Sequence, residues 1–242
     1  MIFEASHFVF EAPKAIARAR RVLIKPCANT QLPYPVSTSP QMLATIVEGI
    51  RKVSDADIVI LEGTPTGAPV RENYNALKYN FPRVLMLDVK DAIWVEVENP
   101  LNKPLIIPTF WIPNVILSSD FLISVTPLKV HNGCPDLTIT NLLSLLPVSK
   151  YTSKKSYDQL YNLGIEKVIA DLYFTLPFDL GIVEARQIFT TEGDDPTIGK
   201  TEEYGKIFIG EPSQVDTEVT ETLGLKAEYL ELIKVARVGL EI

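Results

Sequence analysis

Short apolar runs alternate with amphipathic stretches along this chain, and turn residues separate them. Apolar runs of four to seven residues that are rich in Val, Ile and Leu are typical of strands buried on both faces of a parallel sheet. We therefore predict a mainly parallel sheet. Its predicted strands are Val22–Lys25, Asp57–Glu62, Arg83–Val89, Phe121–Val125, Phe178–Glu184 and Lys206–Ile209.

The stretches between these runs have helical periodicity. Pro40–Val53 places Met42, Ile46 and Ile50 on one face, and Ser39 is a favourable N-cap before a proline in the first helical position. Two later segments have a similar pattern, Ser156–Leu172 and Lys226–Val238. We expect these helices to connect the strands.

Two further segments have other patterns. Trp94–Pro108 alternates between apolar and polar residues on either side of Asn99-Pro100, which predicts an antiparallel ribbon added to the main sheet. Arg186–Gly205 is polar and contains glycine, which predicts a long loop.

Together these elements predict an α/β fold, with a mainly parallel sheet, helices on both faces and the added antiparallel ribbon. The chain has 242 residues, of which 46% are hydrophobic, so it can bury about 70 to 75% of its unfolded surface. No repeat or flexible linker divides the sequence. We therefore expect one domain over residues 1–242.

Charge narrows the range of partners. The formal net charge is −7, and an acidic chain lacks the clustered Lys and Arg that replace phosphate counterions, so we expect no nucleic-acid partner. No apolar run reaches the roughly 18 to 20 residues that a membrane span requires, and the N-terminus has no charged segment followed by a long apolar one. We therefore expect no membrane partner and a cytoplasmic location.

Charged residues close most of the predicted strands. The carboxyl ends of parallel strands meet at one edge of a sheet, where ligands bind in open α/β folds. Salt bridging at an exposed rim is the simpler interpretation, but alternating cations and carboxylates at one edge also favour a functional site. The residues at or just beyond the strand ends are Lys25, Glu62, Asp88, Lys129, His131 and Glu184.

The cysteines and one acidic turn offer further chemistry. Two cysteines are too few for an iron–sulfur cluster, which takes four thiolates. His131 and Cys134 have a spacing that can bring both side chains to one metal, with Cys27 after another strand, but a buried thiol and a hydrogen-bonded histidine explain them equally simply. Glu192–Pro196 gathers three carboxylates that suit a cation or a solvated turn. We assign no metal site.

Several segments, taken in order, resemble one family, the domain of unknown function 362. FLISVTPLKVH is similar to the family's "SVPKLKTH" strand and loop, and the acidic turn is similar to its "EGDGP" loop. The segments that carry the resemblance are VLIKPCANT, STSPQMLATIVEGI, DIVILEG, FLISVTPLKVH, LTITNLLSLLP, IVEARQIFTTEGDDPTIG and KIFIGEPSQVDTEVTETLG.

The resemblance implies functional positions residue by residue. It adds Gly63, Asn141, Glu192, Asp195, Gly199 and Asp216 as ligand-binding candidates. The chain departs from the family pattern at four positions, with Cys27 for asparagine, Thr140 for lysine, Glu184 for aspartate and Asp195 for glycine. Some members carry ferredoxin-like cysteine motifs, which implies redox work. This chain lacks that module, so a redox role would require a separate electron-transfer protein or a bound cofactor that the sequence does not name.

Three functions follow from these residues. The first is an enzyme or binder of a small anionic molecule at the carboxyl edge, where Lys25 and Lys129 hold the anion and His131 transfers protons with Glu62 or Glu184. The second is a non-catalytic redox-partner or protein-interaction scaffold, with ion pairs filling the cleft. The third is a metalloprotein that uses histidine and cysteine ligands. The sequence leaves open whether the chain is an enzyme.

Overall fold

The computed structural model describes residues 1–154 and 156–238. Within these residues an eight-stranded sheet runs in the order β1-β10-β9-β7-β2-β3-β4, and β8 pairs with β7. The strands are β1 (Ile2–Glu4), β2 (Arg21–Pro26), β3 (Asp57–Glu62), β4 (Val84–Asp88), β7 (Phe121–His131), β8 (Cys134–Asp136), β9 (Leu180–Thr191) and β10 (Gly199–Gly210).

The centre of this sheet is parallel. Strands β9, β7, β2, β3 and β4 pair in parallel, whereas β1, β10 and β8 add antiparallel strands. The chain builds β2, β3 and β4 outward in one direction and then returns to place β7 and β9 on the other side of β2. The topological switch point therefore lies between β2 and β7.

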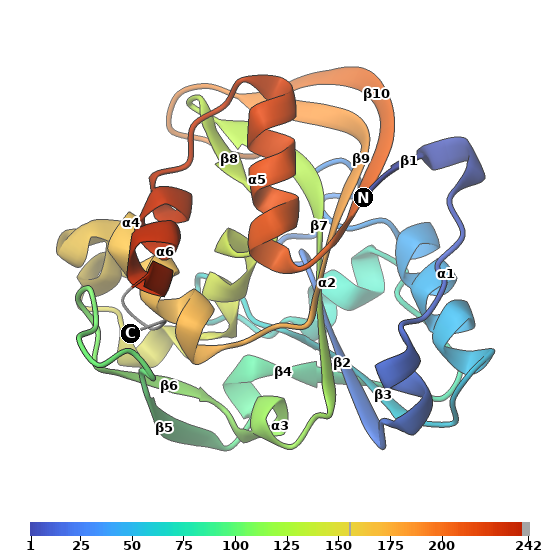
Figure 1. The fold of residues 1–242 in the computed structure, drawn as a ribbon, viewed down its shortest axis with the longest axis horizontal. Helices are drawn as coiled ribbons and strands as arrows, with labels where there is room; N and C mark the ends of the chain where they lie inside the picture. Colours follow the sequence, from blue (N-terminus) through green and yellow to red (C-terminus); the bar gives the residue numbers. More distant parts are fainter. Residues whose placement is uncertain (155, 239–242) are drawn as a thin grey trace.

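Helices cover both faces of the sheet, which confirms the predicted fold class (Figure 1). The α-helices are α1 (Pro40–Arg51), α2 (Arg71–Ala76), α3 (Asn114–Leu117), α4 (Asp158–Thr175), α5 (Pro212–Leu223) and α6 (Glu228–Val238). Short 3-10 helices are η1 (Ala5–His7), η2 (Lys14–Arg18), η3 (Val89–Asp91), η4 (Thr140–Leu145) and η5 (Val148–Lys150). No helix in the described ranges is both long enough and apolar enough to cross a membrane.

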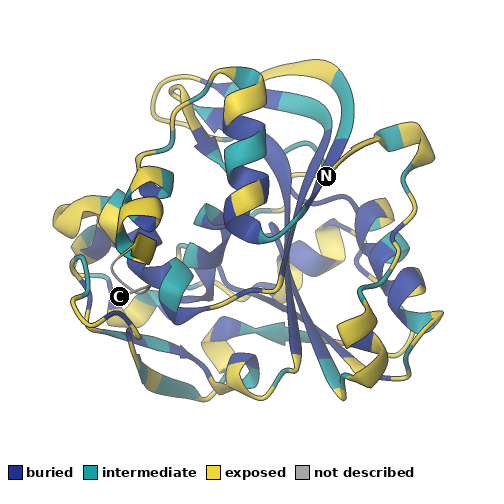
Figure 2. Ribbon diagram, in the orientation of Figure 1, coloured by how far each residue is buried: buried dark blue, intermediate teal, exposed yellow. Residues whose placement is uncertain are grey.

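Alternate residues of the strands supply two cores. In β2, Val22 and Ile24 pack with the buried face of α1, while Leu23 packs with residues of α4 on the opposite face. This alternation follows from the two-residue period of a strand. The sheet is consequently buried throughout its centre, and the helices expose only their outer faces (Figure 2).

The predicted ribbon forms, but its second strand lies later in the chain. Strands β5 (Trp94–Glu98) and β6 (Thr109–Pro113) make a separate two-stranded antiparallel sheet. Residues 105–108 are not its second strand, because the buried Asp171 carboxylate accepts the backbone N–H groups of Leu105, Ile106 and Ile107 at 2.7 to 2.9 Å. These bonds use the donors that a strand pairing would need.

The long loop predicted over Arg186–Gly205 is wrong. The segment is mostly a β-hairpin, in which β9 and β10 pair from Thr191 and Gly199 onward. The outer half of β10, from Gly199 to Glu203, is exposed on every residue. A strand segment that is exposed on both faces has no apolar alternation, so the polar sequence of this half of β10 resembled a loop.

Candidate functional site

Lys25 and Glu62 meet at the carboxyl ends of β2 and β3. The Lys25 ammonium lies 3.0 Å from a Glu62 carboxylate oxygen, and neither side chain has any exposed surface. Lys25 also donates to the Pro26 carbonyl at 2.7 Å and to Asn141 Oδ1 at 2.9 Å. All three ammonium hydrogens therefore have partners inside the protein.

Helix η4 completes this network from above the switch point. Asn141 donates through Nδ2 to the Lys25 carbonyl and to Ser124 Oγ. Ser144, one turn later, donates to the second Glu62 oxygen at 2.6 Å. The backbone N–H groups of Ala28 and Gly63 also bind the Glu62 carboxylate. Protein groups thus fill the position where open α/β folds bind ligands.

Glu184 forms a second buried cluster, at the N-terminus of α1. Its carboxylate accepts the Ser39 N–H at 2.9 Å and the Ser39 hydroxyl at 2.6 Å, and it pairs with the Arg186 guanidinium. Ser39 also accepts the Met42 N–H and so caps the helix. Burial raises the pKa of Glu184 although Arg186 and Ser39 act to lower it. The cluster joins β9 to α1.

Lys129 is more accessible than Lys25. Its ammonium lies 2.6 Å from Asp136 Oδ2 and donates to Cys27 Sγ at 3.2 Å, and 14% of its side chain is exposed. Asp136 accepts a further hydrogen bond from the Thr140 hydroxyl at 2.7 Å. Cys27 is buried against this group. A carboxylate therefore compensates the Lys129 charge next to the edge of the sheet.

The pKa values of this cluster follow from burial and pairing. Burial acts to lower the pKa of Lys129, but Asp136 and Cys27 outweigh it and the pKa is raised. Burial acts to raise the pKa of Asp136, but Lys129 and Thr140 outweigh it and the pKa is lowered. Burial raises the pKa of the Cys27 thiol despite the nearby Lys129. At neutral pH the cluster therefore holds an ammonium, a carboxylate and a neutral thiol.

His131 and Cys134 belong to a tight hairpin. They pair across β7 and β8, and the two residues between them, Asn132 and Gly133, both have positive φ. The Asn-Gly pair is a signal for this type of turn, and our sequence interpretation missed it. His131 Nδ1 lies 2.8 Å from Thr191 Oγ1. Among the described residues no group of three or more His, Cys, Asp or Glu is placed to hold a metal ion.

The acidic turn lies at the tip of the β9–β10 hairpin. Glu192 and Asp195 are exposed, and Gly199 begins β10 opposite Thr191. Asp195 accepts hydrogen bonds from the hydroxyl and backbone of Thr197, which lower its pKa. Asn132 exchanges two hydrogen bonds with the Gly193 backbone, so the two hairpin tips lie together. The turn is separate from the Lys25 network.

Asp216 and Gly63 have structural partners. Asp216, buried in α5, accepts the N–H groups of Thr138 and Ile139 and the hydroxyls of Thr138 and Tyr229. Burial raises the pKa of Asp216 to about 6. A Cβ at Gly63 would lie 2.5 Å from the Ser144 carbonyl oxygen, so glycine allows η4 to approach β3. The Gly63 N–H already binds Glu62, as described above.

The structure adds residues that sequence reasoning missed. Asp136, Ser144 and Arg186 complete the three charged groups, and the sequence analysis named none of them as a candidate. The spacing of Ser144 one turn after Asn141 offered one signal. The Asn132-Gly133 turn offered another, because it places Asp136 opposite Lys129. Arg186 lies two positions after Glu184 in the same strand.

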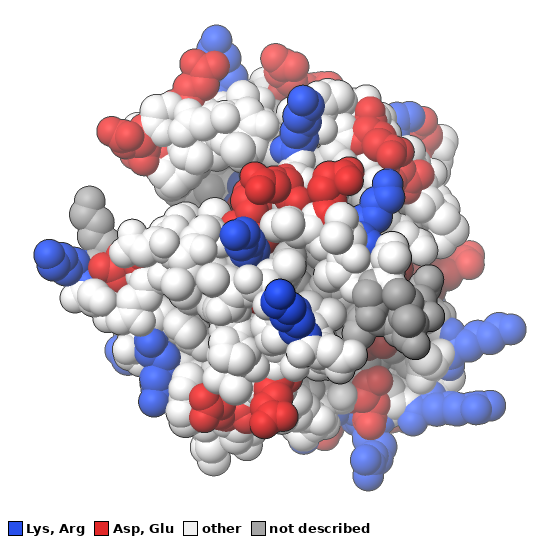
Figure 3. Space-filling model, turned by 60° about the vertical axis from the view of Figure 1, so that its left-hand side comes forward, with Lys and Arg blue, Asp and Glu red and all other residues white. Residues whose placement is uncertain are grey.

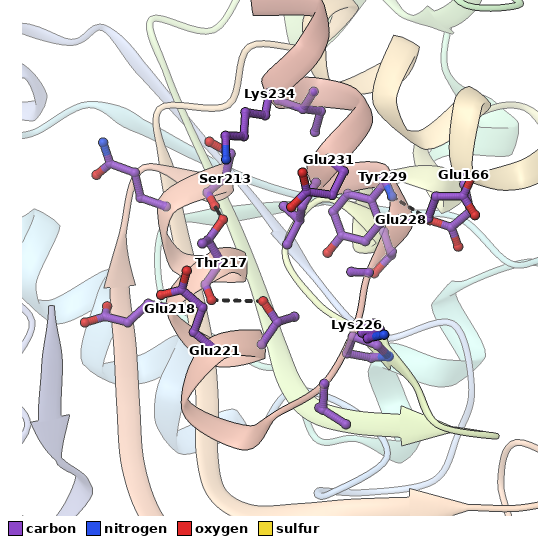
Figure 4. A pocket seen from close by; sticks show the side chains of 18 of the residues that line it. Glu166, Ser213, Thr217, Glu218, Glu221, Lys226, Glu228, Tyr229, Glu231 and Lys234 are labelled. Atoms are coloured by element: carbon purple, nitrogen blue, oxygen red, sulfur yellow. Dashed lines mark hydrogen bonds between the residues drawn. The ribbon is translucent and has the colours of Figure 1, made fainter.

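A groove between α5 and α6 holds the largest of the cavities described here, about 1260 Å³. Ser213, Thr217 and Glu221 line it from α5, and Glu231 and Lys234 line it from α6 (Figure 4). Acidic and basic side chains are mixed on the face of the molecule shown in Figure 3. The volume exceeds the roughly 300 to 1,000 Å³ of most small-molecule pockets.

Comparison with known proteins identifies the family but not an activity. No curated protein matches the chain. The family model described as "Domain of unknown function (DUF362)" matches residues 22–220. This range begins in β2, ends in α5 and includes every charged strand end from Lys25 to Glu184. The chain therefore belongs to the DUF362 family.

Proposed function

We propose that this protein is a non-catalytic binding protein in which the charged strand ends hold the fold together and partners bind in surface grooves. One observation carries the proposal. At the topological switch point, the Lys25 and Glu62 side chains are fully buried and each ionic oxygen or hydrogen has a protein partner. A binding protein needs no reactive group at this point.

The energy of these contacts opposes catalysis at the same residues. An anion that binds Lys25 would have to displace Glu62, and breaking a buried pair costs about 3 to 5 kcal/mol. Proton transfer by Glu62 or Glu184 would require access to carboxylates that are fully buried. These contacts support the scaffold hypothesis over the enzyme hypothesis.

Lys129 is the remaining candidate for an anion at this edge. Its accessible side would bring an anion toward the ionised Asp136, which already neutralises the ammonium at 2.6 Å. The mutual repulsion of the two anions opposes binding there. The proposal therefore places binding outside the strand ends, with the groove between α5 and α6 suited to a segment of a partner protein.

A titration with small anions tests the proposal. Inorganic phosphate and acetate are added at constant ionic strength to isotope-labelled protein, and the backbone amide resonances are followed by NMR. We expect no saturable shift at Lys25, Glu62, Lys129 or Glu184, because their charges are compensated internally. Saturable shifts at these residues would overturn the proposal.

Lys129→Ala is the matched variant for this titration. Its loss of contact with Asp136 and Cys27 is expected to cost about 1 kcal/mol, which lowers the thermal midpoint by roughly 2 to 4 °C for a chain of this size. The anion titration of the variant should equal that of the parent. A saturable response that the variant abolishes would assign an anion site to Lys129 and restore the first hypothesis.

A further inference from the structure

A second groove lies beside α1, on the opposite face of the sheet from α4. It has a volume of about 670 Å³, and we call it the α1 groove. One wall is the outer surface of α1, from Pro40 to Arg51, and the other is the segment 78–83 that joins α2 to β4. The charged strand ends do not line it.

The middle of the α1 groove is apolar. Ala44 and Val47 contribute from α1, and Phe81 and Pro82 contribute from the facing segment. Val47 and Phe81 also belong to the core on this face, so the apolar surface continues inward. An apolar part of a ligand would therefore leave water on entering the groove.

Three cations surround this apolar middle, in a protein whose net charge is −7. They are Arg51, Lys78 and Arg83, and Glu48 is the carboxylate among the lining residues. The Lys78 ammonium has no hydrogen-bond or ion-pair partner among the described residues. Arg83 pairs with Asp55 at 3.2 Å, but both side chains are largely exposed, so the pair holds the cation weakly.

Arg51 is fixed in place without a carboxylate. It donates to the Ala56 carbonyl at 2.6 Å and to the Arg83 carbonyl at 2.9 Å. Its Nε atom is buried and has no partner in the described structure. No carboxylate forms an ion pair with this guanidinium among the described residues, and Asp55 and Asp57 act on its charge from a longer distance.

Two of these cations belong to residues with a left-handed backbone conformation. Lys78 and Arg83 have φ values of 58° and 57°, in the left-handed region that costs a side-chain-bearing residue about 1 to 2 kcal/mol. Lys78 follows α2, where the Tyr79 N–H bonds back to the Tyr74 carbonyl and glycine is the favoured residue. Non-glycine residues in this region are concentrated at functional sites.

We propose that the α1 groove binds a small organic anion with an apolar body. The anionic head group contacts Lys78 and the two guanidinium groups, and the body lies against Val47 and Phe81. The inference rests on the proposed function, in which binding takes place outside the strand ends, and names a site and a ligand class for it. The groove volume lies within the range of small-molecule pockets, which favours a metabolite over a protein segment.

Four compounds with the same eight-carbon body test the role of the head group. Octanoate and octyl phosphate carry an anion, octan-1-ol is neutral and octylamine is a cation. In NMR titrations we expect saturable shifts at the amides of residues 44–51, 78–81 and 83 with the anions, and at least fivefold weaker binding of the alcohol and the amine. The tighter of the two anions would identify the head group as a carboxylate or a phosphate.

Two matched lysine variants separate a specific contact from general electrostatics. Lys52 is exposed beside the groove but does not line it. Lys78→Gln should raise the dissociation constant of the tighter anion about fivefold, whereas Lys52→Gln should leave it within twofold. Lys78→Gly should weaken binding equally without lowering the thermal midpoint, because glycine adopts the left-handed backbone without strain.

The outcomes distinguish this inference from the proposed function. Equal binding of all four compounds, an equal effect of the two glutamine variants, or no shift at the α1 groove would overturn the inference alone. Saturable shifts of the anions at Lys25, Lys129 or Glu184 instead would overturn both the inference and the proposed function.

Discussion

Glu62 shows how individual residues are used at the strand ends. Its two oxygens accept from the Lys25 ammonium, the Ser144 hydroxyl and the N–H groups of Ala28 and Gly63. A buried carboxylate is tolerated only with such complete pairing, because an isolated charge loses its hydration. The same requirement explains why the buried acids Asp171 and Asp216 each accept at least two backbone N–H groups.

The Lys25–Glu62 pair predicts an asymmetric response to substitution. Glu62→Gln leaves the buried ammonium without its counter-charge, and we expect the free energy of unfolding to fall by about 3 to 5 kcal/mol. Urea unfolding measures this loss. The double variant Lys25→Met/Glu62→Leu removes both charges, so it should be more stable than the single variant Glu62→Gln. A single variant within about 1 kcal/mol of the parent would show that the pair does not hold the sheet edge.

Asp216 predicts a pH dependence of stability. Its folded pKa, about 6, lies above its ordinary value of 3.8, so the unfolded state releases this proton first as pH rises. Stability from this group is therefore present below about pH 4 and is lost as pH rises toward 6, by up to about 3 kcal/mol. Unfolding measured at pH 4 and pH 6 should show this loss in the parent and not in Asp216→Asn.

The comparison uses the difference between the free energies of unfolding at pH 4 and pH 6, and not the free energy at either pH. An asparagine cannot accept all the bonds that Asp216 accepts from Thr138, Ile139 and Tyr229, so the variant is less stable at both pH values. If the variant has the same pH dependence as the parent, the effect belongs to other acids whose pKa is raised in the folded state, such as Glu184 or Glu166.

Among the structural elements, η4 covers the buried Lys25–Glu62 network. Six residues form this 3-10 helix, and it lies over β2, β3 and β7 and supplies Asn141 and Ser144 to the buried network. Its close approach depends on Gly63 at the end of β3. A short helix thus determines whether the crevice at the switch point is open or filled.

Gly63→Ala tests this packing. The new methyl group would meet the Ser144 carbonyl oxygen at 2.5 Å, and overpacking of this kind costs about 1 to 3 kcal/mol. Gly210→Ala is the control, because its nearest neighbour is a Val215 side-chain atom at 3.3 Å. Thermal unfolding should show a clearly larger loss for Gly63→Ala. Equal losses would mean that η4 adapts to the extra methyl group.

The sequence predicted the positions of the strands better than it predicted the contacts between their side chains. Buried strands such as Asp57–Glu62 have continuous apolar runs, so the α/β class and the strand ends were predictable. The β9–β10 hairpin was not, because the outer half of β10 is polar and exposed on every residue. Asp136 and Arg186 were also missed, because our interpretation did not use the Asn-Gly turn that places Asp136 opposite Lys129 and assigned Arg186 to a loop instead of the strand that contains Glu184.

At the scale of the whole molecule, strand β1 lies outside the region that matches the family model but pairs with a strand inside it. The matched residues 22–220 contain the parallel centre of the sheet, and β1 precedes them. Strand β1 pairs with the inner half of β10, and the Met1 ammonium binds the Ile209 carbonyl and the Glu218 carboxylate. The start of the chain is thereby fixed to the strand and helix that close the family region.

The buried network also affects cooperativity. Lys25 is 37 positions from Glu62 and 116 from Asn141, so no contiguous fragment shorter than this span contains all three partners. A partly folded chain that has assembled β2 and β3 but not η4 carries an ion pair without its covering layer, which is unfavourable. The network therefore penalises half-formed states and couples the first third of the chain to its middle, so that the sheet edge folds as one unit.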